Sequence, residues 1–259
     1  MYSSEQLGVS IGNVPLRLHI PEAELREKAR LRYAQFLEEA QGGLPVFTTC
    51  AGATDDHGTG TSGHAGDFVY TWEDSSLRLN DTQAHFEGVR HEYGLDSLIR
   101  VLLSMLLARQ RGFLLHAATV MNNGRAYVFT GKSGAGKSTI ASLSPEGTVL
   151  TDEISLLKHV DGGWHAFGTP FWGEFRAEGA NVHAPIAGLY FLSQASEDRV
   201  EKVSLRESIR AILPNVLFFS RELQVTQDLL CLLNEFASSV PCWRLFFRRK
   251  RSLWNVITA

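Results

Sequence analysis

The chain has 259 residues, of which 44% are hydrophobic and 20% are charged, and its formal net charge at pH 7 is -3. This composition suits a globular protein with a substantial core, and so small a charge excludes a whole-molecule field that would attract nucleic acid or a membrane. Three scattered cysteines, no export signal and no membrane-spanning apolar run favour a reduced, cytoplasmic protein without a membrane or nucleic-acid partner.

The first 110 residues mix strand and helix patterns. Strand patterns cover residues 7–20, 67–80 and 82–89, and helical patterns cover residues 21–40 and 94–111. Residues 51–66 are rich in Gly, Thr and small polar side chains and predict a long loop, whose role the sequence does not reveal. We interpret residues 1–110 as an N-terminal α+β extension.

Residues 111–259 begin with a hairpin and continue as an α/β pattern. Apolar strands at 113–121 and 126–131 flank the turn at Asn122–Gly124, where Asn and Gly suit consecutive positive-φ positions. Strand patterns follow at 148–160, 185–194 and 240–249, and helical patterns at 137–143, 204–213 and 221–239. We expect a core in this region, with the extension packed on it as one continuous globular unit.

The segment at residues 131–138, GKSGAGKS, satisfies the G-x-x-x-x-G-K-[ST] pattern in full and stands between a strand and a helix, as the pattern requires. Its glycines let backbone N–H groups converge on one anion, and the next helix adds its positive end. Lys137 suits the outer phosphates, and the Ser138 hydroxyl suits Mg²⁺. We expect the loop to bind a nucleotide's phosphates; a glycine-rich helix cap without a ligand is the alternative.

Two adjacent acids, Asp152 and Glu153, follow the next strand pattern along the chain. Only a short helix and a tight turn separate that strand from the glycine-rich loop, so we expect the carboxylates to return close to it. Phosphoryl transfer needs a carboxylate near the metal ion and a base for the attacking hydroxyl. Adjacent acids can divide those two roles, and a solvated acid pair in a loop is the alternative.

His116 stands within the apolar run at residues 113–121, upstream of the strand that leads into the glycine-rich loop. If the two strands pair through their Asn-Gly turn, the imidazole lies near the loop, within reach of a phosphate or of the acids. A histidine satisfied within the core is an equally good interpretation, and the residues alone leave both open.

The stretches LLHAATV, FTGKSGAGKSTIA and VLTDEISLL, in this order and spacing, resemble the catalytic core of the HPr kinase/phosphorylase family and, more distantly, the ATP-dependent phosphoenolpyruvate carboxykinases. The likeness covers residues 114–157. A weaker likeness runs through GTPFWGE and the C-terminal stretch, which is similar to HPr-kinase-like proteins encoded with peptide-modifying systems. The resemblance implies an α/β fold, a mixed-sheet P-loop kinase core with the α+β extension at its N-terminus.

The resemblance also implies roles for particular residues. Asp152 would be the base that takes the proton from a substrate hydroxyl, His116 would assist at the transferring phosphate, and Ser138 with Glu153 would hold the metal ion. The triphosphate would bind to Gly131, Lys132, Ser133, Gly134, Ala135, Gly136, Lys137, Ser138 and Thr139.

The chain also departs from that family's pattern. Lys132 stands where HPr kinases usually carry an acid, Glu153 replaces an aspartate, and GTPFWGEFR occupies the region of the family's E-[IV]-R-G-L-G signature. These differences favour a dedicated kinase for another protein, peptide or small hydroxyl compound over a bifunctional kinase/phosphorylase.

Phosphoryl transfer also employs an arginine to stabilise charge on the phosphoryl oxygens. The candidates are Arg176, Arg206 and Arg210. We choose Arg176 as the catalytic residue, since loops such as GTPFWGEFR often contact substrate. We interpret the basic cluster FFRRKR, residues 246–251, as a solvated strand end rather than a site for an acidic leader peptide or nucleic acid.

Together these features favour an enzyme that uses ATP and Mg²⁺, an HPr-kinase-like serine kinase that transfers the γ-phosphate to a serine or similar hydroxyl of a peptide or protein. A ribosomal natural-product precursor of the lasso type is one acceptor that the resemblance suggests. Two alternatives stay open: a kinase for free serine or a sugar, and a nucleotide-gated binding protein without catalysis. The resembled family commonly assembles into oligomers, so we also expect a homo-oligomer.

Overall fold

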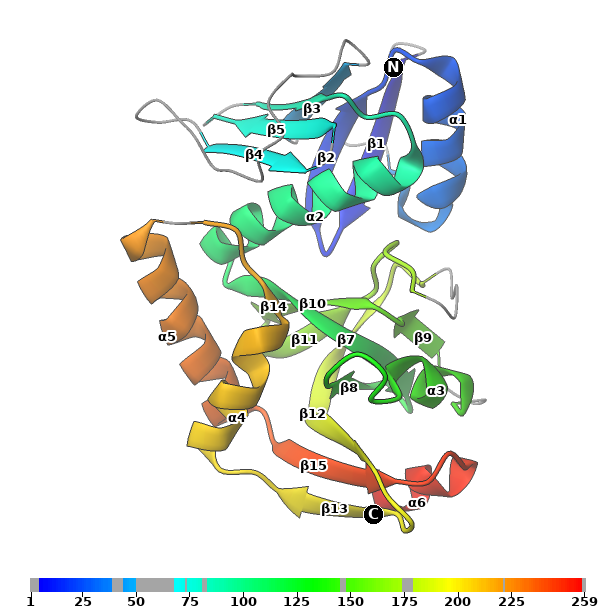
Figure 1. Cartoon of the computed structure of the whole chain (residues 1–259), viewed down its shortest axis with the longest axis vertical. Coiled ribbons are helices and arrows are strands. Elements are labelled where there is room, and N and C mark those ends of the chain that lie inside the picture. Colours follow the sequence, from blue (N-terminus) through cyan, green and yellow to red (C-terminus); the bar gives the residue numbers. More distant parts are fainter. Residues whose placement is uncertain are drawn as a thin grey trace. The chain divides into compact units, whose positions relative to one another are not determined.

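The computed structural model describes residues 5–38, 44–49, 68–72, 74–80, 83–144, 148–173, 179–220 and 222–257. The loop expected at residues 51–66 and Arg176 lie outside these ranges. The chain forms two compact units, Met1–Leu103 and Ser104–Ala259 (Figure 1). Within the described ranges, no helix combines the length and apolar character that crossing a membrane requires.

The first unit contains a mixed six-stranded sheet in the order β1-β2-β3-β6-β5-β4. Its strands are β1 (Gln6–Ile11), β2 (Val14–His19), β3 (Leu44–Thr49), β4 (Phe68–Trp72), β5 (Ser75–Leu79) and β6 (Ala84–Glu87). Gly12 and Asn13, both at positive φ, close the hairpin between β1 and β2. The strand patterns at the N-terminus therefore correspond to real strands, and β2 buries every second residue.

A buried ion pair joins α1 (Ala23–Arg32) to the part of α2 (Glu92–Arg109) that belongs to this unit. Arg32 pairs with Asp96, and the Tyr33 hydroxyl donates to Asp96 Oδ1 at 2.6 Å. Burial raises the pKa of Asp96, while the hydrogen bond from Arg32 opposes that change. The helix expected to continue to residue 40 ends at Arg32, because Tyr33 leaves helical geometry as its ring enters the core, and the short 3₁₀ helix η1 (Ala34–Phe36) follows.

The second unit is built on a mixed nine-stranded sheet whose main path is β11-β10-β7-β8-β12-β15-β13, with β9 and β14 also paired to β7. Its strands are β7 (Gly112–Asn122), β8 (Arg125–Thr130), β9 (Thr148–Thr151), β10 (Ile154–Val160), β11 (Gly163–Phe167), β12 (His183–Gln194), β13 (Arg199–Lys202), β14 (Val216–Leu217) and β15 (Cys242–Phe247). β12 runs parallel to β8 and β15, whereas β7 is antiparallel to β8, β9 and β10.

Helices cover both faces of this sheet (Figure 1). They are α3 (Lys137–Ser142), α4 (Leu205–Ile212), α5 (Leu223–Ser239) and α6 (Trp254–Ile257), with the 3₁₀ helices η2 (Leu213–Asn215) and η3 (Arg251–Leu253). Along β8, Ala126 and Val128 belong to the core under α4 and α5, whereas Tyr127 and Phe129 belong to the core under α3 and α6. The alternation of a strand buried on both sides thus produces two cores from one sheet.

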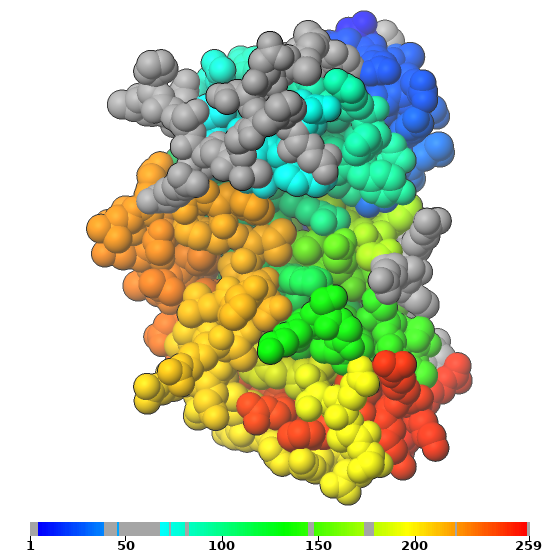
Figure 2. Space-filling model, in the orientation of Figure 1, coloured from blue at the N-terminus to red at the C-terminus, as the bar shows by residue number. Residues whose placement is uncertain are grey.

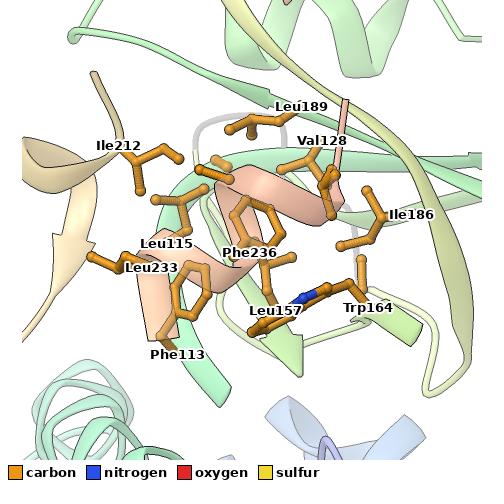
Figure 3. Packing of buried hydrophobic residues seen from close by; sticks show 14 of the residues in the cluster. Phe113, Leu115, Val128, Leu157, Trp164, Ile186, Leu189, Ile212, Leu233 and Phe236 are labelled. Carbon is orange, nitrogen blue, oxygen red and sulfur yellow. The ribbon is translucent and has the colours of Figure 1, made fainter. Parts of the chain in front are cut away.

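Aromatic rings fix α5 on the sheet. Phe236 of α5 meets Phe113 of β7 edge to face at 5.3 Å between ring centroids, and Trp164 of β11 at 5.0 Å (Figure 3). Phe113 and Trp164 also contact each other at 5.9 Å. Such edge-to-face contacts add to the burial of apolar area. They connect β7 to β11 and α5.

Candidate functional site

The glycine-rich loop lies between the end of β8 at Thr130 and the start of α3 at Lys137. Gly136, just before the helix, has a φ of 110°. A Cβ atom at this position would approach Phe247 Cζ to 2.7 Å. Both the backbone conformation and the packing against β15 therefore require glycine here.

Lys137 folds back over the loop that precedes it. Its Nζ donates to the carbonyl oxygen of Gly131 at 3.1 Å, and the residue is 8% exposed. Burial lowers the pKa of Lys137, and the negative charge of Glu153 acts to raise it. The ammonium group thus contacts the loop and feels the charge of Glu153, which lies between β9 and β10.

Asp152 and Glu153 directly follow the end of β9, as expected, but they separate β9 from β10 where one continuous strand was expected at residues 148–160. Both flanking strands pair with β7, and between them the Ala117 N–H of β7 donates to the Glu153 carbonyl oxygen at 3.0 Å. Thr151 Oγ1 accepts the N–H groups of Glu153 at 3.3 Å and Ile154 at 3.2 Å, which bends the chain locally at the acids. Because pairing with β7 resumes at Ile154, the two acids stay anchored on both sides.

A backbone contact holds the Asp152 side chain, which is nearly completely buried. The Gly173 N–H donates to Asp152 Oδ1 at 2.8 Å, and Asp152 is 2% exposed. A Cβ atom at position 173 would lie 3.0 Å from Asp152 Oδ2 and 3.2 Å from Glu153 Cβ. The absence of a side chain at Gly173 therefore lets this loop approach both acids.

His116 of β7 lies opposite Ile154 of β10, next to the acids. On the other side of the strand, the following residue, Ala117, pairs with Thr130, and the Thr130 hydroxyl donates to the His116 carbonyl oxygen at 2.9 Å. β7 therefore carries His116 to the point where β8 ends and the glycine-rich loop begins. The hairpin through the Asn-Gly turn forms as expected.

These segments enclose a pocket of about 420 Å³. It is lined by His116, Ser133, Gly134, Gly136, Lys137, Ser138, Thr139, Asp152, Glu153, Gly173 and Arg249. Most of the residues selected from the sequence thus meet in one cavity. Gly131, Lys132 and Ala135 belong to the same loop without lining the pocket, although Gly131 receives the Lys137 hydrogen bond.

The sequence did not identify Arg249 as a pocket residue or Gly173 as a contact of Asp152. Arg249 belongs to the basic cluster that we interpreted as a solvated strand end; it follows β15 and is exposed to solvent, and it also lines the pocket. Arg206 and Arg210 lie on α4 and do not line it. The only sequence signal for Arg249 was its position shortly after the final strand pattern. Its basic neighbours share that position, so the signal did not single it out.

The oxygen ligands in the pocket fit a magnesium ion that shares its coordination with phosphates. Ser138 offers a hydroxyl, and Asp152 and Glu153 offer carboxylates. Across the described ranges, no three His, Cys, Asp or Glu side chains cluster closely enough to hold a metal ion by themselves. Mg²⁺ commonly uses one or two protein carboxylates and completes its shell with phosphates and water, so an all-protein cage is unnecessary.

Three comparisons with known proteins extend these observations. A family model described as "SynChlorMet cassette protein ScmC" matches residues 95–258, a range that includes every residue lining the pocket. The Hpr(Ser) kinase/phosphatase from Coxiella burnetii is similar at 13% sequence identity and a TM-score of 0.28, over 48% of this chain and 92% of that chain. Values this low do not establish a shared fold. No curated protein matches the chain.

Proposed function

Because the chain belongs to the SynChlorMet cassette protein ScmC family, we propose that the pocket is the active site of an ATP- and Mg²⁺-dependent kinase that acts within the cassette. The acceptor in this proposal is a serine or similar hydroxyl of a peptide or protein. One observation carries the proposal: a glycine-rich loop with its lysine, an imidazole and two adjacent carboxylates line the same cavity. Each of these groups has a distinct task in phosphoryl transfer.

The glycine-rich loop and Lys137 bind the phosphates in this proposal, and the segment acts as a P-loop. Backbone N–H groups of the loop and the first turn of α3 point toward an anion placed at the helix start. Lys137 already lies against the loop and is substantially buried, so its charge acts in a partly desolvated setting. Ser138 and Glu153 hold Mg²⁺, which neutralises charge on the phosphate oxygens.

Asp152 acts as the base. Its carboxylate accepts the proton of the acceptor hydroxyl as the hydroxyl oxygen forms a bond to the γ-phosphorus, and the bond from that phosphorus to the β–γ bridging oxygen breaks, releasing ADP. The hydrogen bond from Gly173 orients the carboxylate, and His116 contacts the transferring phosphoryl group. The sequence resemblance to HPr kinases supports the same division of roles.

The test is transfer of labelled phosphate. The purified chain is incubated with Mg²⁺, γ-labelled ATP and, in turn, each peptide or protein encoded in the same cassette, and label is located by mass spectrometry. The Lys137→Ala variant is the negative control. Label on a serine of one product supports the proposal. Tight ATP binding with no transfer to any cassette product, free serine or sugars would instead favour the nucleotide-gated binding protein.

A further inference from the structure

A second strongly basic side chain, Arg249, lines the pocket together with Lys137. Arg249 follows β15 and is exposed to solvent. Its Nη2 donates to Gln194 Oε1 at 3.5 Å, and among the described residues it forms no ion pair. A guanidinium group carries five N–H donors, so most of this group's donor capacity faces water or the cavity.

Gln194 connects this arginine to the glycine-rich loop. It is the last residue of β12, and its Nε2 donates to the Gly134 carbonyl oxygen at 3.0 Å while its Oε1 accepts from Arg249. Parallel pairing places Gln194 opposite Phe247, two residues before Arg249. Figure 2 shows the red C-terminal segment and the yellow end of β12 side by side on the surface. One side chain thus aligns the loop and the arginine.

The neighbouring arginine, Arg248, anchors the segment after β15 and has different hydrogen-bond partners from Arg249. The Arg248 N–H donates to Asp198 Oδ1 at 2.7 Å, and Nη2 of the same residue donates to Asp198 Oδ2 at 2.9 Å. Ser252 also donates to Asp198 Oδ2, at 2.6 Å. Arg248 therefore fixes the backbone that follows β15. This fixed backbone in turn orients Arg249 toward the pocket.

We propose that Arg249 binds the phosphate chain of the nucleotide and stabilises the phosphoryl group during its transfer, with Gln194 as the residue that positions it. The inference rests on the proposed kinase function and names the arginine that this reaction employs. A guanidinium group presents paired donors that match two phosphate oxygens, which a lysine cannot do. Its positive charge also offsets the two carboxylates that share the cavity.

Nucleotide binding tests this inference without an acceptor. Affinities of the full chain for Mg-ATP, Mg-ADP, and ADP with Mg²⁺ and aluminium fluoride, a mimic of the transferring phosphoryl group, are measured by calorimetry. For Arg249→Gln we expect affinity to fall about tenfold for Mg-ATP and about a hundredfold for the fluoride complex, with at most about a twofold change for Mg-ADP. Arg251→Gln, an exposed arginine in the same cluster that does not line the pocket, is the matched control.

Two further variants separate charge from geometry. Arg249→Lys keeps the charge but loses the paired donors, so it should recover most of the Mg-ATP affinity and little of the affinity for the fluoride complex. Gln194→Ala should weaken the fluoride complex about tenfold in the native background and add little to Arg249→Gln, since a positioning residue acts through its partner. Fully additive losses would overturn the positioning role of Gln194.

The outcomes distinguish the two proposals. If the native chain binds Mg-ATP and Arg249→Gln behaves as Arg251→Gln does, the role of Arg249 is overturned while the kinase proposal stands. If the native chain binds neither Mg-ATP nor the fluoride complex, both are overturned. Circular dichroism and thermal melting of each variant establish that it is folded, and Arg249→Lys provides the comparison should Arg249→Gln fail to fold.

Discussion

The Asp152 carboxylate is nearly completely buried and accepts a hydrogen bond from the N–H group of Gly173. Burial of an acid costs free energy unless hydrogen bonds or charges compensate it. Lys137 and Arg249 line the same pocket, so their positive charges face the cavity that Asp152 also lines. In our proposal this carboxylate accepts the proton of the acceptor hydroxyl, and one substitution tests that role.

Replacing Asp152 by Asn should remove transfer and leave nucleotide affinity within about twofold of native, because Asn keeps the shape and the Gly173 contact but is a far poorer base. We expect the rate of phosphate transfer, or of ADP release where no acceptor is known, to fall by about a thousandfold. Lys137→Ala should instead reduce affinity for Mg-ATP. Equal loss of affinity and rate in Asp152→Asn would identify Asp152 as a metal ligand or a folding residue.

Gly173 provides a second test, of geometry alone. Replacing it by Ala would place a Cβ atom 3.0 Å from Asp152 Oδ2, so the carboxylate must shift. Small displacements of reacting groups are costly, and we expect an about tenfold lower turnover with nearly unchanged Mg-ATP affinity. Gly163→Ala is the control, since a Cβ atom there meets nothing within 4 Å. Equal turnover in the two variants would contradict this account of Gly173.

Among the elements of the second unit, β7 organises the site. It pairs with β8, which leads into the glycine-rich loop, and with β9 and β10, which flank the acids, and it carries His116 itself. The end of β15 adds the basic segment, anchored by Asp198. The hydrogen bond from the Arg248 side chain is the main cause that lowers the pKa of Asp198 to about 2.

This lowered pKa predicts a pH dependence of stability. An unfolded aspartate titrates near pH ~3.9, so the Asp198 contribution is fully present above about pH 4 and is lost as the pH falls from about 4 to about 2. The difference in unfolding free energy between native protein and Asp198→Asn should therefore shrink as the pH is lowered from 5 to about 3 in urea titrations. A difference that stays constant over this range would show that the charge of Asp198 contributes nothing.

For the whole molecule, the site residues all belong to the unit that spans Ser104–Ala259, and the family match at residues 95–258 covers nearly all of this unit. The first unit has its own sheet and its own buried ion pair between helices. The expectation of an N-terminal extension and a C-terminal core stays a prediction, as does a homo-oligomer.

A ligand that binds only the folded chain stabilises it by mass action. At a Mg-ATP concentration about 100 times its dissociation constant, we expect the free energy of unfolding to rise by about 2.7 kcal/mol, which thermal or urea unfolding would detect. Lys137→Ala should show a much smaller increase at the same concentration. An equal increase in this variant would mean that ATP binds elsewhere.

The glycine-rich loop could be predicted from the sequence because its chemistry is contiguous: eight adjacent residues contain the turn, the lysine and the hydroxyl. The proximity of Asp152 and His116 could also be predicted, since a short helix and a hairpin leave the connected strands little freedom. The break in the strand at the acids could not. An apolar pattern indicates which residues are buried, but not where a side chain such as that of Thr151 takes backbone N–H groups and interrupts regular strand geometry.

The sequence by itself therefore determined a mixed α/β chain with a candidate phosphate-binding loop, a histidine and an acid pair close to it. Only the tertiary structure decided that Arg249 lines the pocket while Arg248 binds Asp198. The two arginines are adjacent and chemically identical, so no local pattern separates them. Their difference comes from contacts with distant segments, since Asp198 binds Arg248 whereas Gln194 at the end of β12 accepts from Arg249.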